Sequence, residues 1–192
     1  MSIKAIIFDF FGVISSEVSP FWFAERFSPD EAKILKDKYM TPADRGDVTE
    51  EELFESLSQV SGDSPYEIEK DFERKTVIDK DMVEYIKALG QSYKLVLLSN
   101  ALASWLRKIL TRHNLEELFD LVIISSEVGM IKPDKKIFDL ALERIGVKAE
   151  EAIFIDDNEK NTDGAKSVGI NAVVFRDLEE LKYKIAKITK KP

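Results

Sequence analysis

The chain has 192 residues, of which 44% are hydrophobic, and it contains no cysteine. The absence of cysteine excludes disulfide bonds, thiolate catalysis and cysteine-ligated metal centres. With 36 acidic and 28 basic residues the net charge is -8, which argues against nucleic acid as a partner. No apolar run is long enough for a membrane span and the start lacks a signal-peptide pattern, so we expect a cytoplasmic protein without a membrane partner.

Five short apolar runs predict five β-strands. The runs are continuous rather than alternating, which is typical of strands buried on both faces of a parallel sheet. Helical patterns at residues 102–114, 133–145 and 162–168 separate the later runs. Because strands and helices alternate, the sequence predicts an α/β fold with a doubly wound parallel sheet. The predicted strands are residues 4–10, 94–100, 121–125, 152–157 and 171–176.

The interval between the first two predicted strands is too long for a single crossover connection. It contains three helix starts of the capping-box type, in which a glutamate follows three residues after Ser28, Thr49 and Ser64. We therefore expect an inserted α-helical cap over residues 15–90. The α/β core would then consist of residues 1–14 and 91–192.

Polar residues end three of the predicted strands. In an open parallel sheet, ligands bind outside the carboxyl ends of the strands. Each polar residue by itself could be a helix cap or a solvated loop residue. Three such strand ends at one edge, with a lysine before the helix pattern at 133–145, indicate a functional site instead. The residues are Asp9, Ser99, Asn100, Asp156, Asp157 and Lys132.

Four motifs carry a family resemblance. They are FDFFGV (8–13), LLSN (97–100), GMIKPD (129–134) and IDDNEKN (155–161). In this order they resemble the haloacid dehalogenase (HAD) superfamily of hydrolases that use an aspartate nucleophile. The resemblance spans nearly the whole chain and implies a Rossmann-like core with a helical cap inserted after the first motif.

The resemblance implies phosphoryl transfer on a small phosphorylated or anionic metabolite. Asp9 would attack phosphorus and form an aspartyl-phosphate. Ser99 and Asn100 would donate hydrogen bonds to the phosphoryl oxygens, and Lys132 would screen the negative charges.

The resemblance also implies a bound Mg²⁺ ion, since a phosphate dianion cannot approach clustered carboxylates without a cation. Asp9 and Asp157 would bind the ion directly, and Asp156 directly or through water. The backbone carbonyl of Phe11 would complete the protein ligands. Asn161 is expected to support these ligands without touching the ion.

Phe11 departs from the family pattern. Phosphatases of the superfamily have a second aspartate at this position, which acts as general acid and base. Its loss typically costs ~10²- to 10⁴-fold in rate. Three functions therefore stay open: a slow or specialised phosphatase, a 2-haloacid dehalogenase-type hydrolase, and a non-catalytic member that binds a phosphorylated ligand or a protein. The acid pair Asp156 and Asp157 disfavours the dehalogenase, because without metal it would repel an anionic substrate.

Four further residues have two interpretations each. Glu17 follows the first motif and is a remote candidate to replace the missing acid. We expect His113 at the surface near a helix end rather than in a proton relay. We expect Arg45 in a solvated turn and Trp105 in core packing, rather than in contact with a substrate.

Overall fold

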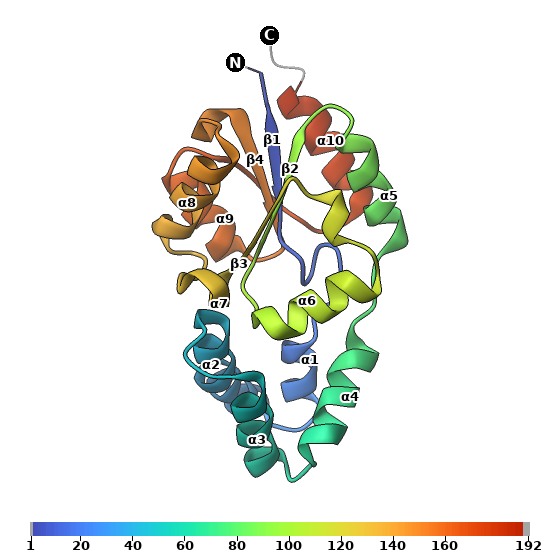
Figure 1. Ribbon diagram of the computed structural model, residues 1–192, viewed down its shortest axis with the longest axis vertical. Helices are drawn as coiled ribbons and strands as arrows, with labels where there is room; N and C mark the ends of the chain where they lie inside the picture. Colours follow the sequence, from blue (N-terminus) through green and yellow to red (C-terminus); the bar gives the residue numbers. More distant parts are fainter. Residues whose placement is uncertain (1, 190–192) are drawn as a thin grey trace.

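A five-stranded, all-parallel sheet forms the centre of the molecule, in the strand order β3-β2-β1-β4-β5 (Figure 1). The computed structural model describes residues 2–189. Each strand lies inside its predicted range, which confirms the doubly wound α/β fold. The strands are β1 (Ala5–Phe8), β2 (Lys94–Ser99), β3 (Leu121–Ile124), β4 (Ala152–Asp156) and β5 (Asn171–Val174).

Helices cover both faces of the sheet, as the continuous apolar strands require. On one face Ile137, Phe138 and Ala165 pack against Ile7 and other strand residues. The helices of the sheet region are α5 (Lys80–Leu89), α6 (Ala103–Arg112), α7 (Ser125–Val128), α8 (Lys135–Ile145), α9 (Glu159–Ser167) and α10 (Leu178–Thr189), with short 3₁₀ turns at Glu116–Leu118 and Ala149–Glu151. Helix α8 begins two residues later than expected, because Lys132 and Pro133 belong to the preceding turn and Asp134 is the N-cap.

Four helices form a separate lobe beyond the carboxyl ends of the strands (Figure 1). The capping boxes predicted at the starts of three of these helices are present. In one of them Thr49 Oγ1 accepts from the Glu52 amide at 3.2 Å, while the Thr49 amide donates to the Glu52 carboxylate at 2.7 Å. The helices are α1 (Ser19–Ala24), α2 (Pro29–Arg45), α3 (Glu50–Ser61) and α4 (Pro65–Lys75). No helix within residues 2–189 combines the length and the hydropathy of a bilayer span.

The two connections between this lobe and the core lie side by side. The Ser16 amide donates to the Val77 carbonyl at 3.0 Å, and the Asp79 amide donates to the Ile14 carbonyl at 2.9 Å. Helix α5, which follows, lies beside α10 at the sheet (Figure 1). We therefore propose that the cap consists of residues 17–76, a shorter segment than the expected 15–90, because α5 packs with the core.

Candidate active site

Asp9 lies directly after β1, at the carboxyl edge of the sheet. Its backbone amide continues the strand ladder by donating to the Ile155 carbonyl at 2.9 Å. The residue is 8% exposed, and Oδ1 accepts from the Phe10 amide at 2.7 Å. Because β1 is flanked by β2 and β4, the three polar strand ends noted in the sequence meet at this edge.

Lys132 joins two of these strand ends. Its buried ammonium lies 2.8 Å from Asp9 Oδ1 and 2.7 Å from Asp156 Oδ2. Burial alone would lower the pKa of Lys132, but the two carboxylates raise it above its ordinary value. Burial, followed by the charge of Asp156, raises the pKa of Asp9 well above its usual range, while Lys132 opposes that rise. One cation thus holds two carboxylates that would otherwise repel each other.

Asn100 holds the backbone that carries Lys132. Its Oδ1 accepts from the Lys132 amide at 2.8 Å, and its Nδ2 donates to the Lys132 carbonyl at 2.9 Å. A side-chain amide has two N–H groups, so one remains for a phosphoryl oxygen. The neighbouring Ser99 is fully buried, and its hydroxyl has no hydrogen-bond partner among residues 2–189. Such an orphaned hydroxyl is costly unless a ligand satisfies it.

Asp156 is the most constrained carboxylate of the site. In addition to Lys132, it accepts from the Asn158 amide at 2.8 Å and from Asn161 Nδ2 at 3.0 and 3.1 Å. Asn161 is itself buried at the start of α9. The geometry therefore suits the supporting position that the sequence predicted for Asn161, with Asp156 oriented by groups on three sides.

The carboxylates of Asp9, Asp156 and Asp157 form a cluster that suits a divalent cation. Each offers an oxygen within 4.8 Å of the others. Burial, together with the charge of Asp156, raises the pKa of Asp157. Three carboxylates against one lysine leave an excess of negative charge, and oxygen ligands are those that Mg²⁺ prefers. The donor set therefore fits the ion that the motifs imply.

Gly12 makes room for one of these carboxylates. Its φ of +81° lies in the region that favours glycine, and a Cβ there would come within 2.5 Å of Asp157 Cγ. A side chain at this position would therefore force Asp157 to move. The neighbouring Phe11 is half-buried, and its ring packs edge-on against Phe10 at 5.0 Å between centroids.

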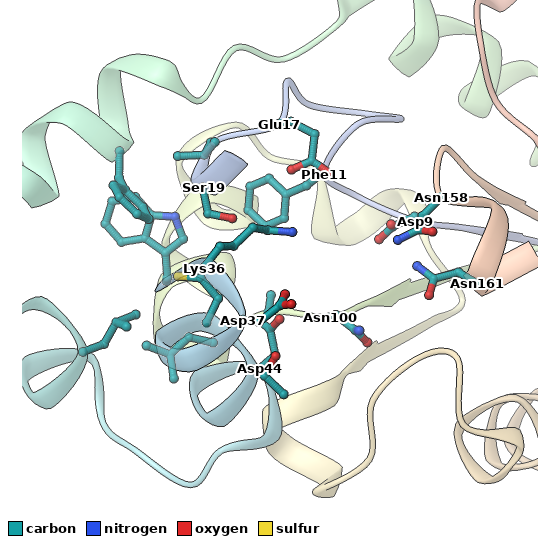
Figure 2. A pocket seen from close by; sticks show the side chains of 18 of the residues that line it. Asp9, Phe11, Glu17, Ser19, Lys36, Asp37, Asp44, Asn100, Asn158 and Asn161 are labelled. Carbon is teal, nitrogen blue, oxygen red and sulfur yellow. The ribbon is translucent and has the colours of Figure 1, made fainter. Parts of the chain in front are cut away.

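A cavity connects the carboxylate cluster with the cap (Figure 2). Asp9, Phe11, Asn100 and Asp157 line it on the core side. Figure 2 shows the Phe11 ring and the Glu17 carboxyl in this space, facing side chains of the cap. The cap contributes Lys36, Met40, Asp44, Leu53, Phe54 and Phe72.

The end of α2 is docked directly on the core. The Ser125 hydroxyl donates to the Asp44 carbonyl and accepts from the Ala101 amide at 2.9 Å. Gly46, which ends α2, lies so close to Ser126 that a Cβ would come within 2.5 Å of its carbonyl oxygen. These contacts fix the polar residues of α2 over the cavity.

The four residues that had two interpretations in the sequence lie in different environments in the structure. Glu17 and Trp105 both line the cavity, and Trp105 is also packed to 8% exposure. Arg45 is exposed, as expected, and lies 3.8 Å from Asp47, but it is the last residue of α2 rather than part of a turn. His113 is exposed at the end of α6, as expected.

The sequence reasoning missed the polar residues of α2. Lys36, Asp37 and Asp44 belong to no motif, and on a helix they look like an ordinary solvated face. The sequence signal for Asp44 is weak: it lies in the last turn of the helix, two residues before the glycine that ends it. Asn158 also lines the cavity and was overlooked inside the fourth motif.

Asp44→Asn should stabilise the protein at neutral and alkaline pH. Burial raises the pKa of Asp44 from 3.8 to about 7, with Lys36 and Lys132 acting in the opposite direction. The folded state keeps this proton at pH values where the unfolded chain has lost it. The natural chain therefore loses stability as the pH rises from about 4 to about 7. A shift of about three units corresponds to roughly 4 kcal/mol, the upper bound of the effect.

Urea unfolding in EDTA at about pH 5.5 and about pH 8 measures this effect. The stability of Asp44→Asn relative to the natural chain should increase by about 1 to 2 kcal/mol between these two pH values. Asp37→Asn, which removes an exposed carboxyl from the same helix, is the matched control and should change little. A pH-independent difference between Asp44→Asn and the natural chain would contradict the burial of an ionisable Asp44.

A sequence model of the haloacid dehalogenase-like hydrolases matches residues 3–169. A sesquiterpene phosphatase of Aspergillus oryzae is 27% identical over 91% of the chain and 90% of its own length. A drimenol cyclase of Aspergillus calidoustus is 25% identical over 99% of the chain, and a phosphoserine phosphatase of Thermus thermophilus is 40% identical over 45% of it. The matches cover only 37% and 35% of the lengths of these last two relatives.

Solved structures show the same architecture. A HAD-like family hydrolase from Porphyromonas gingivalis superimposes with a TM-score of 0.82, at 25% identity over 100% of both chains. A HAD family enzyme from Bacteroides thetaiotaomicron, in complex with magnesium and inorganic phosphate, superimposes with a TM-score of 0.77. It is 25% identical over 94% of this chain and 99% of its own.

Proposed function

Because the chain belongs to the haloacid dehalogenase-like hydrolases, we propose that it hydrolyses phosphate monoesters through attack of Asp9 on phosphorus. One observation carries the proposal: Lys132 bridges Asp9 and Asp156 at 2.8 and 2.7 Å, beside Asp157. The Lys132 ammonium opposes the rise in the pKa of Asp9 that burial and Asp156 cause, and Asp9 lines a pocket that can receive a phosphate group. Phosphatases among the relatives and a neighbouring structure with bound magnesium and phosphate support the same chemistry.

The reaction would proceed in two displacements at phosphorus. In the first, Asp9 Oδ2 attacks while Oδ1 stays in its hydrogen bonds to the Phe10 amide and Lys132, and the ester oxygen leaves with its electron pair. In the second, water attacks phosphorus of the aspartyl-phosphate and loses a proton to the solvent, its oxygen joins the released phosphate, and the Asp9 carboxylate is restored. Lys132, the free N–H of Asn100 and the hydroxyl of Ser99 would stabilise the charge on the phosphoryl oxygens.

Magnesium would be held by Asp9, Asp157 and the carbonyl of Phe11, with Asp156 direct or through water. When bound, the ion neutralises the phosphoryl oxygens and polarises phosphorus. The residues themselves orient the site: Asn161 and Asn158 hold Asp156, and Gly12 leaves space for Asp157.

Phe11 would restrict the substrates. Its ring can neither protonate the departing oxygen nor activate water, so esters with acidic leaving groups should react best. An aryl phosphate meets this condition, whereas an alkyl phosphate does not. The clustered carboxylates argue against a haloacid as substrate, because its own carboxylate would be repelled.

Release of phosphate from para-nitrophenyl phosphate, with Mg²⁺ and with EDTA, tests the proposal. We expect slow turnover that depends on Mg²⁺ and is lost in Asp9→Asn. Chloride release from a haloacid without metal would contradict the proposal and indicate that the chain is a dehalogenase. Binding of Mg²⁺ and phosphate without any turnover would replace it by a non-catalytic, ligand-binding role.

A further inference from the structure

The cavity above Asp9 has two chemically different ends. The core end carries the carboxylates and amides described above. The far end, formed by three helices of the cap and one of the core, is lined by hydrocarbon and aromatic side chains. These are Met40, Leu53, Phe54, Phe72 and Trp105.

Three aromatic rings make the far end a preformed wall. The centroids of Phe54 and Phe72 lie 5.6 Å apart, those of Phe54 and Trp105 5.8 Å, and those of Phe72 and Trp105 6.1 Å. All three pairs are edge-on, an arrangement that aromatic rings favour. The rings come from α3, α4 and α6, so the wall joins the cap to the core. A ligand group placed here meets a rigid apolar surface.

The polar rim of the cavity is mainly acidic. It carries the carboxyl groups of Glu17, Asp37 and Asp44 and the hydroxyls of Ser19 and Thr41, against the single ammonium of Lys36. Within residues 2–189, none of these side chains forms an ion pair or hydrogen bond with another residue. Burial, followed by the charge of Asp157, raises the pKa of Glu17, and burial also raises that of Asp44. Such a rim disfavours a second anionic group on the substrate.

We propose, on the basis of the function proposed above, that the substrate is a phosphate monoester of an apolar, uncharged alcohol or phenol. Its phosphate lies at Asp9, and its hydrocarbon part extends past Phe11 to the wall of Phe54, Phe72 and Trp105. Hydroxyl groups of a sugar or a polyol would lose water at this wall without gaining hydrogen bonds. Each buried methylene, in contrast, strengthens binding about fourfold.

Alkylphosphonates test this substrate class separately from turnover, because their carbon–phosphorus bond is not an ester. Calorimetric titration with Mg²⁺ should give a dissociation constant at least tenfold lower for butylphosphonate than for methylphosphonate. Octylphosphonate should bind more tightly again. A dihydroxybutyl phosphonate should bind no better than the methyl compound. Equal affinity for all four would overturn the apolar substrate class and leave the phosphatase proposal intact.

Substitutions on α2 test where the alkyl group of the phosphonate binds. Met40→Gln places an amide at the apolar end and should raise the dissociation constant of octylphosphonate at least fivefold. The dissociation constant of methylphosphonate should stay unchanged, which shows that the variant is correctly folded. Ile34→Gln, on the exposed side of the same helix, is the matched control and should change neither affinity. Unchanged octylphosphonate binding in Met40→Gln would overturn the inference. If no phosphonate and no inorganic phosphate binds with Mg²⁺, the proposed function itself fails.

Discussion

Phe11→Asp should raise kcat/KM for an alkyl phosphate by ~10²- to 10⁴-fold, the range that a general acid–base group typically contributes. The new carboxyl would stand two residues after Asp9, on the wall of the cavity that Phe11 now lines. It could protonate the departing alkoxide and then accept a proton from the attacking water. An aryl phosphate, whose leaving group needs less protonation, should gain much less.

Steady-state kinetics with an alkyl and an aryl phosphate, both with Mg²⁺, measure this gain. Phe11→Asn is the matched control, because it removes the ring in the same way but has no titratable proton. The half-buried position of Phe11 makes both variants compatible with the fold. If Phe11→Asn raises the alkyl rate as much as Phe11→Asp does, the ring acts by blocking access and the acid–base explanation is wrong.

Lys132→Met should destabilise the protein by about 3 to 5 kcal/mol, as expected when one partner of a buried ion pair is removed. Asp9 and Asp156 would then face each other without a cation, in a region where both are 8% exposed or less. The loss should be largest in EDTA at neutral pH. It should shrink as the pH falls, because burial raises the pKa of Asp9 and protonation of Asp9 removes the repulsion.

Urea unfolding compares this variant with two others. Lys135→Met, an exposed lysine three residues further on, is the control for loss of a lysine and should cost little. The double variant Lys132→Met with Asp156→Asn should recover part of the stability, since only one buried charge remains. A loss below about 1 kcal/mol for Lys132→Met would mean that water already reaches the carboxylates and that the ion pairs are not truly buried.

The five strands, and the polar residues that end three of them, could be predicted from the sequence for a simple physical reason. A strand buried on both faces must be apolar throughout, so the run that ends at Asp9 and the run that ends at Asp156 are visible without coordinates. Parallel strands also bring their carboxyl ends to one edge, which predicts that these residues meet. Helix starts such as Thr49 were readable because a capping box is formed within four residues.

The roles of Asn100 and Lys132 needed the tertiary structure. The sequence places both near the site, but only the structure shows that Asn100 forms hydrogen bonds with the amide and the carbonyl of Lys132. Likewise, only the structure shows that the Lys132 ammonium lies between Asp9 and Asp156. These contacts link residues more than twenty positions apart. Their geometry depends on how a turn after α7 approaches β2, and no local pattern encodes that approach.

The cavity could not be predicted from the sequence, because it forms only where the cap docks on the core. Lys36, Met40 and Asp44 lie on a helix whose sequence is that of a common solvated helix. They line the cavity that contains Asp9 because Ser125 and Ser126 hold the end of α2 against the core. Local propensity determines that α2 is a helix and where it begins. The direction in which it presents its side chains depends on contacts between distant segments, which are settled only when the whole chain is packed.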